Sequence, residues 1–142
     1  MIQRIQSIFL LLAAGASFGA LATPFANAKG AVQNAIFADQ VYNVQDNPAL
    51  LIVFALAGVL AVASIFLFKN RATQSRIAIV ALVANLGGLA FAVIFLLQQV
   101  SFASVALSVG IFLPLVAGLF IWLAQRNIRK DEKLVRSMDR LR

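Results

Sequence analysis

Four long apolar runs separated by short polar stretches dominate the chain. The runs cover about residues 5–25, 48–68, 77–97 and 105–124. Each is about 20 residues long, the length of an α-helix that crosses the hydrocarbon core of a bilayer. Their apolar residues are nearly continuous and lack the regular spacing of a half-buried helix or strand. The pattern predicts a single all-α membrane domain over residues 1–142, a bundle of four transmembrane helices.

The first run has a second interpretation. Arg4 precedes it, and Ala26-Asn27-Ala28 follows it, as in a signal peptide with a small-residue cleavage site. The run is, however, longer than the roughly 7–15 residues of a usual signal core. We therefore expect it to stay as the first span and to end at Thr23-Pro24. Cleavage would leave three spans.

The connection over residues 28–47 mixes apolar and polar residues. This mixture suits a short hairpin, and it suits an amphipathic segment at the membrane surface equally well. At its end, Asn47 is placed to cap the next helix, and Pro48 suits the first helical position because no hydrogen-bond donor is needed there. The second span is expected to begin at Pro48.

The remaining connections are short, and the last span leads into a basic tail. Residues 69–76 contain three cations and no acid, and residues 98–104 form a second predicted tight turn. Pro114 is expected to kink the fourth span. The tail, residues 126–142, is expected to continue from it as a short basic amphipathic helix. Its apolar stripe consists of Ile128, Leu134, Val135, Met138 and Leu141.

Charge placement predicts the orientation. Of the 12 Lys and Arg residues, only Lys29 lies in the connection over residues 28–47, and all others lie on the opposite side of the predicted membrane. Cytoplasmic connections are enriched in Lys and Arg. We therefore expect both termini and residues 69–76 in the cytoplasm, residues 28–47 outside it, and the chain in a bacterial inner membrane.

Composition narrows the classes of function. The chain has no Cys and no His, which removes disulfides, thiolate chemistry and the commonest metal ligand. The centres of the spans contain no charged residue, so proton relays and ion-coupled transport lack their usual groups. No nucleophile has a plausible base, and no phosphate-binding loop is present. We expect neither an enzyme nor a bound cofactor.

Small residues recur at four-residue steps on the predicted spans, which places them on one face of each helix. Such faces let transmembrane helices approach closely. Packing within the bundle is the simpler interpretation, and docking of another membrane protein is the functional one. Asn85 is included as the most polar residue well inside a predicted span, because such groups commonly hydrogen-bond a neighbouring helix. The candidate residues are Gly15, Gly19, Ala84, Asn85, Gly88, Ala106, Gly110 and Gly118.

The basic tail has two interpretations. Its cations either fix the topology only, or they bind anionic lipid headgroups or a cytoplasmic partner. The net charge of +7 does not indicate nucleic acid binding, because no recognition motif or aromatic platform accompanies it. The candidate residues are Arg126, Arg129, Lys130, Lys133, Arg136, Arg140 and Arg142.

Both ends of the sequence, Met1-Ile2-Gln3-Arg4-Ile5-Gln6 and the segment over residues 128–142, resemble an uncharacterised family of short four-span inner-membrane proteins of Bacteroidota. The segment over residues 42–48, ahead of the second span, adds to this resemblance. The similarity covers the whole chain, and the tail is its most specific part. It implies a four-helix membrane protein that retains its first span, and it implies no activity.

These observations predict helices that can pack against other membrane helices and a sequence without recognisable catalytic groups. We expect a non-enzymatic accessory or assembly subunit of an inner-membrane complex, with the bilayer and other membrane subunits as partners and anionic lipid at the tail; a homo-oligomer is compatible with this. The alternative is a small channel or transporter for a neutral solute, lined by Asn85, Gln98 and serines. A lipid-modifying enzyme ranks third, because no suitable acid or nucleophile is found.

Overall fold

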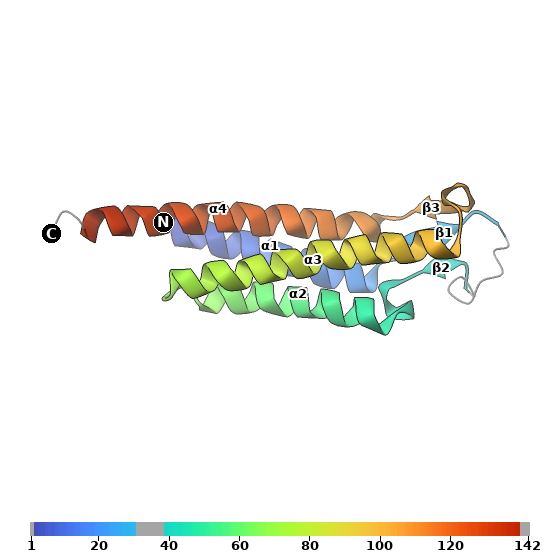
Figure 1. Ribbon diagram of the computed structural model, residues 1–142, viewed down its shortest axis with the longest axis horizontal. Coiled ribbons are helices and arrows are strands. Elements are labelled where there is room, and N and C mark those ends of the chain that lie inside the picture. The colour runs from blue at the N-terminus through green and yellow to red at the C-terminus, as the bar shows by residue number, and fades with distance from the viewer. Residues whose placement is uncertain (1, 31–38, 140–142) are drawn as a thin grey trace.

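The computed structural model describes residues 2–30 and 39–139, and Figure 1 shows four long helices and a small sheet. The helices are α1 (Ile2–Ala22), α2 (Pro48–Phe66), α3 (Arg71–Gln99) and α4 (Leu113–Asp139). Helices adjacent in sequence run in opposite directions, and α1 also packs against α4. The predicted all-α bundle of four helices is thus confirmed, and α1 and α3 occupy opposite corners of it.

The bundle has two different ends. α1 begins and α4 finishes at one of them, where residues 67–70 also connect α2 to α3 (Figure 1). We call this the basic end, because it contains Lys69, Arg71 and Arg76 and the cations of α4. At the other, the sheet end, three short strands cover the ends of the helices (Figure 1).

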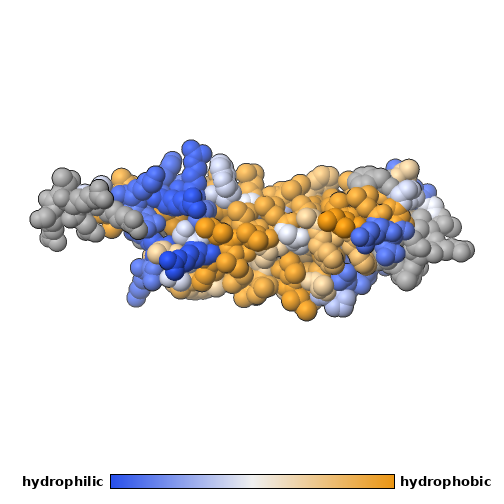
Figure 2. Space-filling view, in the orientation of Figure 1, coloured by the Kyte–Doolittle hydropathy of each residue, from blue (hydrophilic) through white to orange (hydrophobic). Residues whose placement is uncertain are grey.

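The outer surface of the bundle is apolar over most of its length. Each helix has a segment long and apolar enough to cross a membrane, and only 28–44% of the residues in those segments are buried. Large apolar side chains point outward, such as Val83 at 65% exposure and Leu119 at 55%. In Figure 2 an apolar band separates polar regions at the two ends. Water does not solvate such a band well, so the fold fits a multi-pass membrane protein.

The sheet consists of β1 (Ala26–Ala28), β2 (Val41–Tyr42) and β3 (Val105–Leu107), in the order β2-β1-β3 with both pairs antiparallel. β1 and β2 form the hairpin that was one of the two interpretations of residues 28–47. The residues between them, 31–38, lie outside the described residues. A short 3₁₀ helix, η2 (Val44–Asp46), then leads to α2.

The prediction that the fourth span begins at residue 105 was wrong. After the 3₁₀ helix η3 (Phe102–Ser104), the chain forms β3 and a second 3₁₀ helix, η4 (Val109–Phe112), and α4 begins only at Leu113. β3 pairs with β1, and the amide of Gly110 donates to Pro24 O at 3.0 Å. These hydrogen bonds hold residues 105–112 against the end of α1 in a non-helical conformation.

Pro114 likewise does not lie in the middle of an α-helix. It is the second residue of α4, where its missing N–H group costs nothing. It therefore helps to begin the helix, and the expected kink in the fourth span does not follow from it.

The other helix ends follow from their capping residues. The Asn47 side chain accepts a hydrogen bond from Ala49 N at 3.0 Å, and Pro48 is the first residue of α2, as predicted. Asn70 caps α3 in the same way, so that α3 begins at Arg71, inside the predicted connection over residues 69–76. α4 continues to Asp139 without interruption, so the described part of the basic tail belongs to the same helix as the fourth span.

Two buried clusters form the core. At the sheet end, the rings of Phe25 and Phe54 meet edge-on with centroids 5.8 Å apart, and Tyr42 packs on Phe25. At the basic end, small residues dominate and let the helices approach closely. That cluster comprises Leu10, Ala13, Ala78, Ala81, Ile121 and Ala124.

Candidate functional site

Several of the predicted small residues are used inside the bundle. A Cβ atom added at Gly88 would lie 2.9 Å from Val53 Cγ1, and one added at Gly118 would lie 3.1 Å from Leu86 Cδ2. Gly19 meets α4 in the same manner. At these positions the absence of a side chain allows two helices of this chain to touch. They serve packing within the bundle.

Gly15 of α1 and Gly87 of α3 are different. Both are exposed, and a Cβ atom at either position would meet nothing within 4 Å. Ala84, one turn before Gly88 on α3, is partly exposed. Because α1 and α3 lie at opposite corners, Gly15 and Gly87 mark two separate open positions on the outside of the bundle. The internal packing of the bundle uses neither of them.

Ala106 and Gly110 do not belong to a helix face with Gly118. Ala106 lies in β3, opposite Asn27 of β1, and Gly110 lies in η4. A Cβ atom at Gly110 would collide with the carbonyl oxygens of Thr23 and Pro24. Glycine is therefore required there by the close approach of two backbone segments at the sheet end. The prediction of a continuous seam from residue 106 to residue 118 was wrong for this reason.

Asn85 lies at the centre of the bundle and is fully buried. Its Nδ2 donates to Ser17 Oγ of α1 at 2.6 Å, and Ser17 is also fully buried. The hydrogen bond joins the two helices that lie diagonally opposite each other. This contact gives Asn85 a structural role between helices.

The sequence analysis missed a polar layer near the basic end of the core. Gln74 Nε2 donates to Ser64 O at 2.9 Å, and Gln125 Nε2 donates to Ser75 Oγ at 2.7 Å. Gln6 of α1 is also buried, at 3% exposure. α1 and α3 run in the same direction, and Gln6 lies as far before Ser17 as Gln74 lies before Asn85, so both glutamines lie at one depth. The recurrence of Gln near one end of several apolar runs was the available signal.

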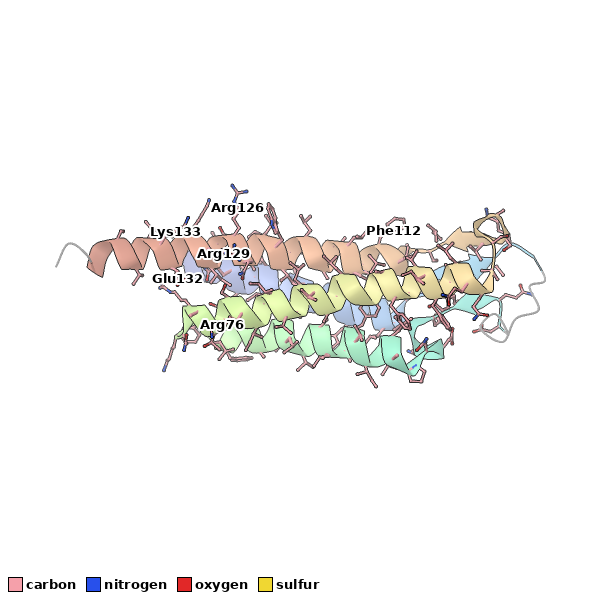
Figure 3. The ribbon with its side chains drawn as sticks, in the orientation of Figure 1. Arg76, Phe112, Arg126, Arg129, Glu132 and Lys133 are labelled. Carbon is pink, nitrogen blue, oxygen red and sulfur yellow. The ribbon has the colours of Figure 1, made fainter. Side chains whose placement is uncertain are left out.

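A groove opens on the outside of the bundle at this end, between α3 and α4. Its volume is about 430 Å³. Ile79 and Leu82 of α3 form its apolar wall. From α4 it is lined by Trp122, Gln125, Arg126, Arg129, Lys130 and Lys133. Figure 3 shows Arg126, Arg129 and Lys133 along one stretch of α4, with Arg76 on neighbouring α3. We call this the basic groove.

The acids at this end lie beside the basic groove. Asp131 Oδ2 is 3.1 Å from Arg71 Nη2, so an ion pair joins α4 to the beginning of α3. Glu132 lines a smaller adjacent groove of about 260 Å³ with Ser75, Arg129 and Lys133. Asp131 thus pairs with α3, Glu132 lies beside Arg129 and Lys133 in the adjacent groove, and the charged residues that line the basic groove itself are the four cations.

Besides the four cations named for the basic groove, the predicted tail site includes three others. Arg136 belongs to the last turns of α4. Arg140 and Arg142 lie outside the described residues. Among residues 2–30 and 39–139, no group of three or more acidic side chains lies close enough to hold a metal ion. The described geometry thus offers helix surfaces and a cationic groove.

A family described as Domain of unknown function (DUF4293) matches residues 2–141. No curated protein and no solved structure matches the chain.

Proposed function

We propose that this chain, which belongs to the DUF4293 family of domains of unknown function, is a non-enzymatic accessory or assembly subunit of a bacterial inner-membrane complex. Its apolar helix surfaces would bind other membrane subunits, and its basic end would face the cytoplasm. These neighbours would include further copies of this chain.

The observation that carries this proposal is the open surface at Gly15 and Gly87. A glycine inside a helix costs about 1 kcal/mol relative to alanine, and on a lipid-facing surface it gains no contact in return. Its benefit in membrane helices is the close approach of another helix. No helix of this bundle approaches either glycine. A helix from another subunit would supply that contact.

The projecting end of α4 supports the same proposal. α4 has 27 residues and α2 has 19, so at about 1.5 Å per residue α4 is roughly 12 Å longer. It extends beyond the other helices at the basic end (Figure 1). Leu134 and Val135 on this extension are 53% and 41% exposed and follow the cations Lys130 and Lys133. An apolar and basic helix end of this kind suits a docking segment of a partner.

The proposed orientation of the protein in the membrane rests on the placement of its charges. The described cations gather at the basic end, and Lys29 lies alone near the sheet end. The enrichment of Lys and Arg on the cytoplasmic side favours a cytoplasmic basic end. The channel alternative has less support, because Asn85, its central lining residue, is buried against Ser17.

Purification from the native host in a mild detergent tests the proposal. The wild-type chain is expected to co-purify with at least one other membrane protein in fixed proportion, or with further copies of itself. Gly15→Leu and Gly87→Leu add bulk to the open surfaces and should reduce the co-purified amount at least tenfold. Val59→Leu adds bulk at another exposed position, 54% exposed on α2, and should not change it. A wild-type chain that is recovered only as a monomer would contradict the proposal.

A further inference from the structure

The basic groove combines charge and apolar surface in one place. Arg126, Arg129, Lys130 and Lys133 follow the spacing i, i+3, i+4, i+7 and so share one face of α4. No acid lines this groove among the described residues. The summed positive charge of the four cations attracts a phosphate or carboxylate group, and guanidinium groups bind phosphate with paired hydrogen bonds.

The apolar part of the groove continues along the bundle. Ile79 is 37% exposed, and one and two turns further along α3, toward the bundle centre, lie Val83 at 65% and Leu86 at 42%. On α4, Leu119 and Leu115 continue the same surface at 55% and 51% exposure. The cations thus lie at the basic end of this surface, which is apolar from there toward the bundle centre.

Trp122 marks the depth of the groove. It is 49% exposed, and the guanidinium carbon of Arg126 lies 5.8 Å from the centre of its ring. Tryptophan concentrates at the boundary between hydrocarbon and headgroups, and the Arg126 contact places a cation on the headgroup side of it. The groove therefore lies at the level of lipid phosphates.

From these observations we propose that the basic groove binds one anionic glycerophospholipid. Its phosphate lies among the cations of α4, and its acyl chains lie along the exposed apolar surface of α3 and α4. The volume of about 430 Å³ suits a headgroup. This proposal rests on the groove alone and does not depend on a partner subunit.

The apolar residues of the groove favour a lipid over a free phosphate ion or an acidic peptide. Free phosphate would bind the cations and leave the apolar surfaces of Ile79 and Trp122 uncovered. An acidic peptide from the cytoplasm would meet the cations but would not reach the apolar surface below them. An amphiphilic anion that shares the bilayer with the protein satisfies both parts of the groove.

The test uses the full chain in phosphatidylcholine nanodiscs and its single tryptophan as the probe. A small fraction of the lipid is replaced by acyl-brominated phosphatidylglycerol or, in parallel, by acyl-brominated phosphatidylcholine. Bromine quenches the fluorescence of an adjacent tryptophan. The brominated phosphatidylglycerol is expected to quench Trp122 with an apparent affinity at least about tenfold higher than that of the brominated phosphatidylcholine. Each Lys or Arg near the headgroups contributes about fivefold, and screening by salt reduces the combined effect of the four cations.

Matched variants distinguish binding in the groove from nonspecific attraction of anionic lipid by the net positive charge of the basic end. Arg126→Gln/Arg129→Gln and Lys130→Gln/Lys133→Gln each remove two groove cations, and both pairs should bring the preference close to one. All four side chains are exposed, but Arg126 contacts the Trp122 ring, so the second pair keeps the test valid if the first pair changes the fluorescence of Trp122 itself. Lys69→Gln/Arg76→Gln removes two cations outside the groove and should keep the preference.

Three results would overturn the proposal. The first is equal quenching by the two brominated lipids. The second is an equal loss of preference in the groove variants and in the Lys69→Gln/Arg76→Gln control, which would show attraction by surface charge alone. The third is displacement of the lipid by inorganic phosphate or by a soluble acidic peptide at millimolar concentration, which would show that the apolar residues of the groove make no contribution.

Discussion

Asn85 and Ser17 join α1 and α3 across the centre of the bundle. The Oδ1 atom of Asn85 has no hydrogen-bond partner among the described residues, so one of its polar groups is satisfied and the other is not. The net contribution of such a pair is small, whereas leaving either partner alone is costly. The pair therefore specifies which helices meet more than it adds stability.

A double-mutant cycle tests this account of the pair. Ser17→Ala leaves the Asn85 amide buried without its acceptor and should destabilise the protein by about 1–2 kcal/mol. Adding Asn85→Leu removes the remaining polar group and should recover most of that loss, with a coupling of about 0.5–1.5 kcal/mol. Reversible unfolding in mixed micelles measures these values. Additive effects of the two substitutions would show that the hydrogen bond has no structural role.

The environment of Tyr42 changes the acidity of its phenol. It is the single tyrosine, is fully buried in β2, and donates its hydroxyl to Ala92 O at 3.4 Å. Burial, and secondly the negative charge of Asp46, raise the pKa of Tyr42 from 10.0 to about 12. The neutral phenol is thus favoured by the folded state.

The pH dependence follows from the direction of this pKa shift. The stabilisation is fully present below pH 10, the pKa of an unfolded tyrosine, and is lost as the pH rises toward about 12. Absorbance at 295 nm, where tyrosinate absorbs, should give a single midpoint near pH 12 in the folded protein. Tyr42→Phe should remove the signal. A midpoint near pH 10 in the folded protein would show that Tyr42 is exposed to water.

At the scale of elements, the sheet end is the part of the fold with the strictest backbone geometry. β1 connects the end of α1 to both β2 and β3, and η4 lies directly on residues 23–24. Lys29 N donates to Ser104 O and Ser108 N donates to Phe25 O, both within 2.9 Å. These bonds fix where α4 begins, and thereby its register against α1.

Gly110→Ala tests this geometry. The added methyl group would meet the carbonyl oxygens of Thr23 and Pro24, which belong to backbone that cannot move aside easily. The expected loss is about 1–3 kcal/mol in the free energy of unfolding. Gly15→Ala is the matched control, because the new methyl group would meet open space and should cause no loss. Equal stability of the two variants would contradict the contact at the sheet end.

The helices could be predicted from the sequence, and the sheet could not. Four apolar runs, Asn47 and Pro48 were sufficient for the spans and for the beginning of α2. Residues 105–112 are as apolar as a span, so their strand and 3₁₀ helix depend on pairing with β1, which is distant in sequence. Gly110 and Pro114 were the local indications of this irregular segment. Without the structure, a small-residue helix face explained Gly110 and a helix kink explained Pro114 equally well.

The candidate site was predictable in part. Lys and Arg spacing identified the cationic face of α4, because one helix continues through it. The groove was not predictable, since Ile79 and Leu82 come from α3 and depend on how the two helices pack. The sequence also did not distinguish Gly15 from Gly19, because both repeat on one helix and only the positions of α2 and α4 separate an open glycine from a packed one.

At the scale of the whole molecule, charge and apolar surface are arranged along one axis. The apolar band lies between the basic end and the sheet end (Figure 2), and all four helices are long enough to cross it. An even number of crossings places both termini on one side. The proposed subunit contacts and the lipid site both require that the apolar band lies in the bilayer and the basic end at its surface.

Single-cysteine labelling tests this arrangement most directly, because the chain has no cysteine of its own. Ala103→Cys and Asp39→Cys place a thiol at the sheet end, and Ala72→Cys and Ser137→Cys place one at the basic end, all at exposed positions. In spheroplasts, a membrane-impermeant maleimide is expected to label the first two variants only, and the other two only after lysis. Labelling of Ser137→Cys and Ala103→Cys from the same side of the membrane would contradict the four crossings.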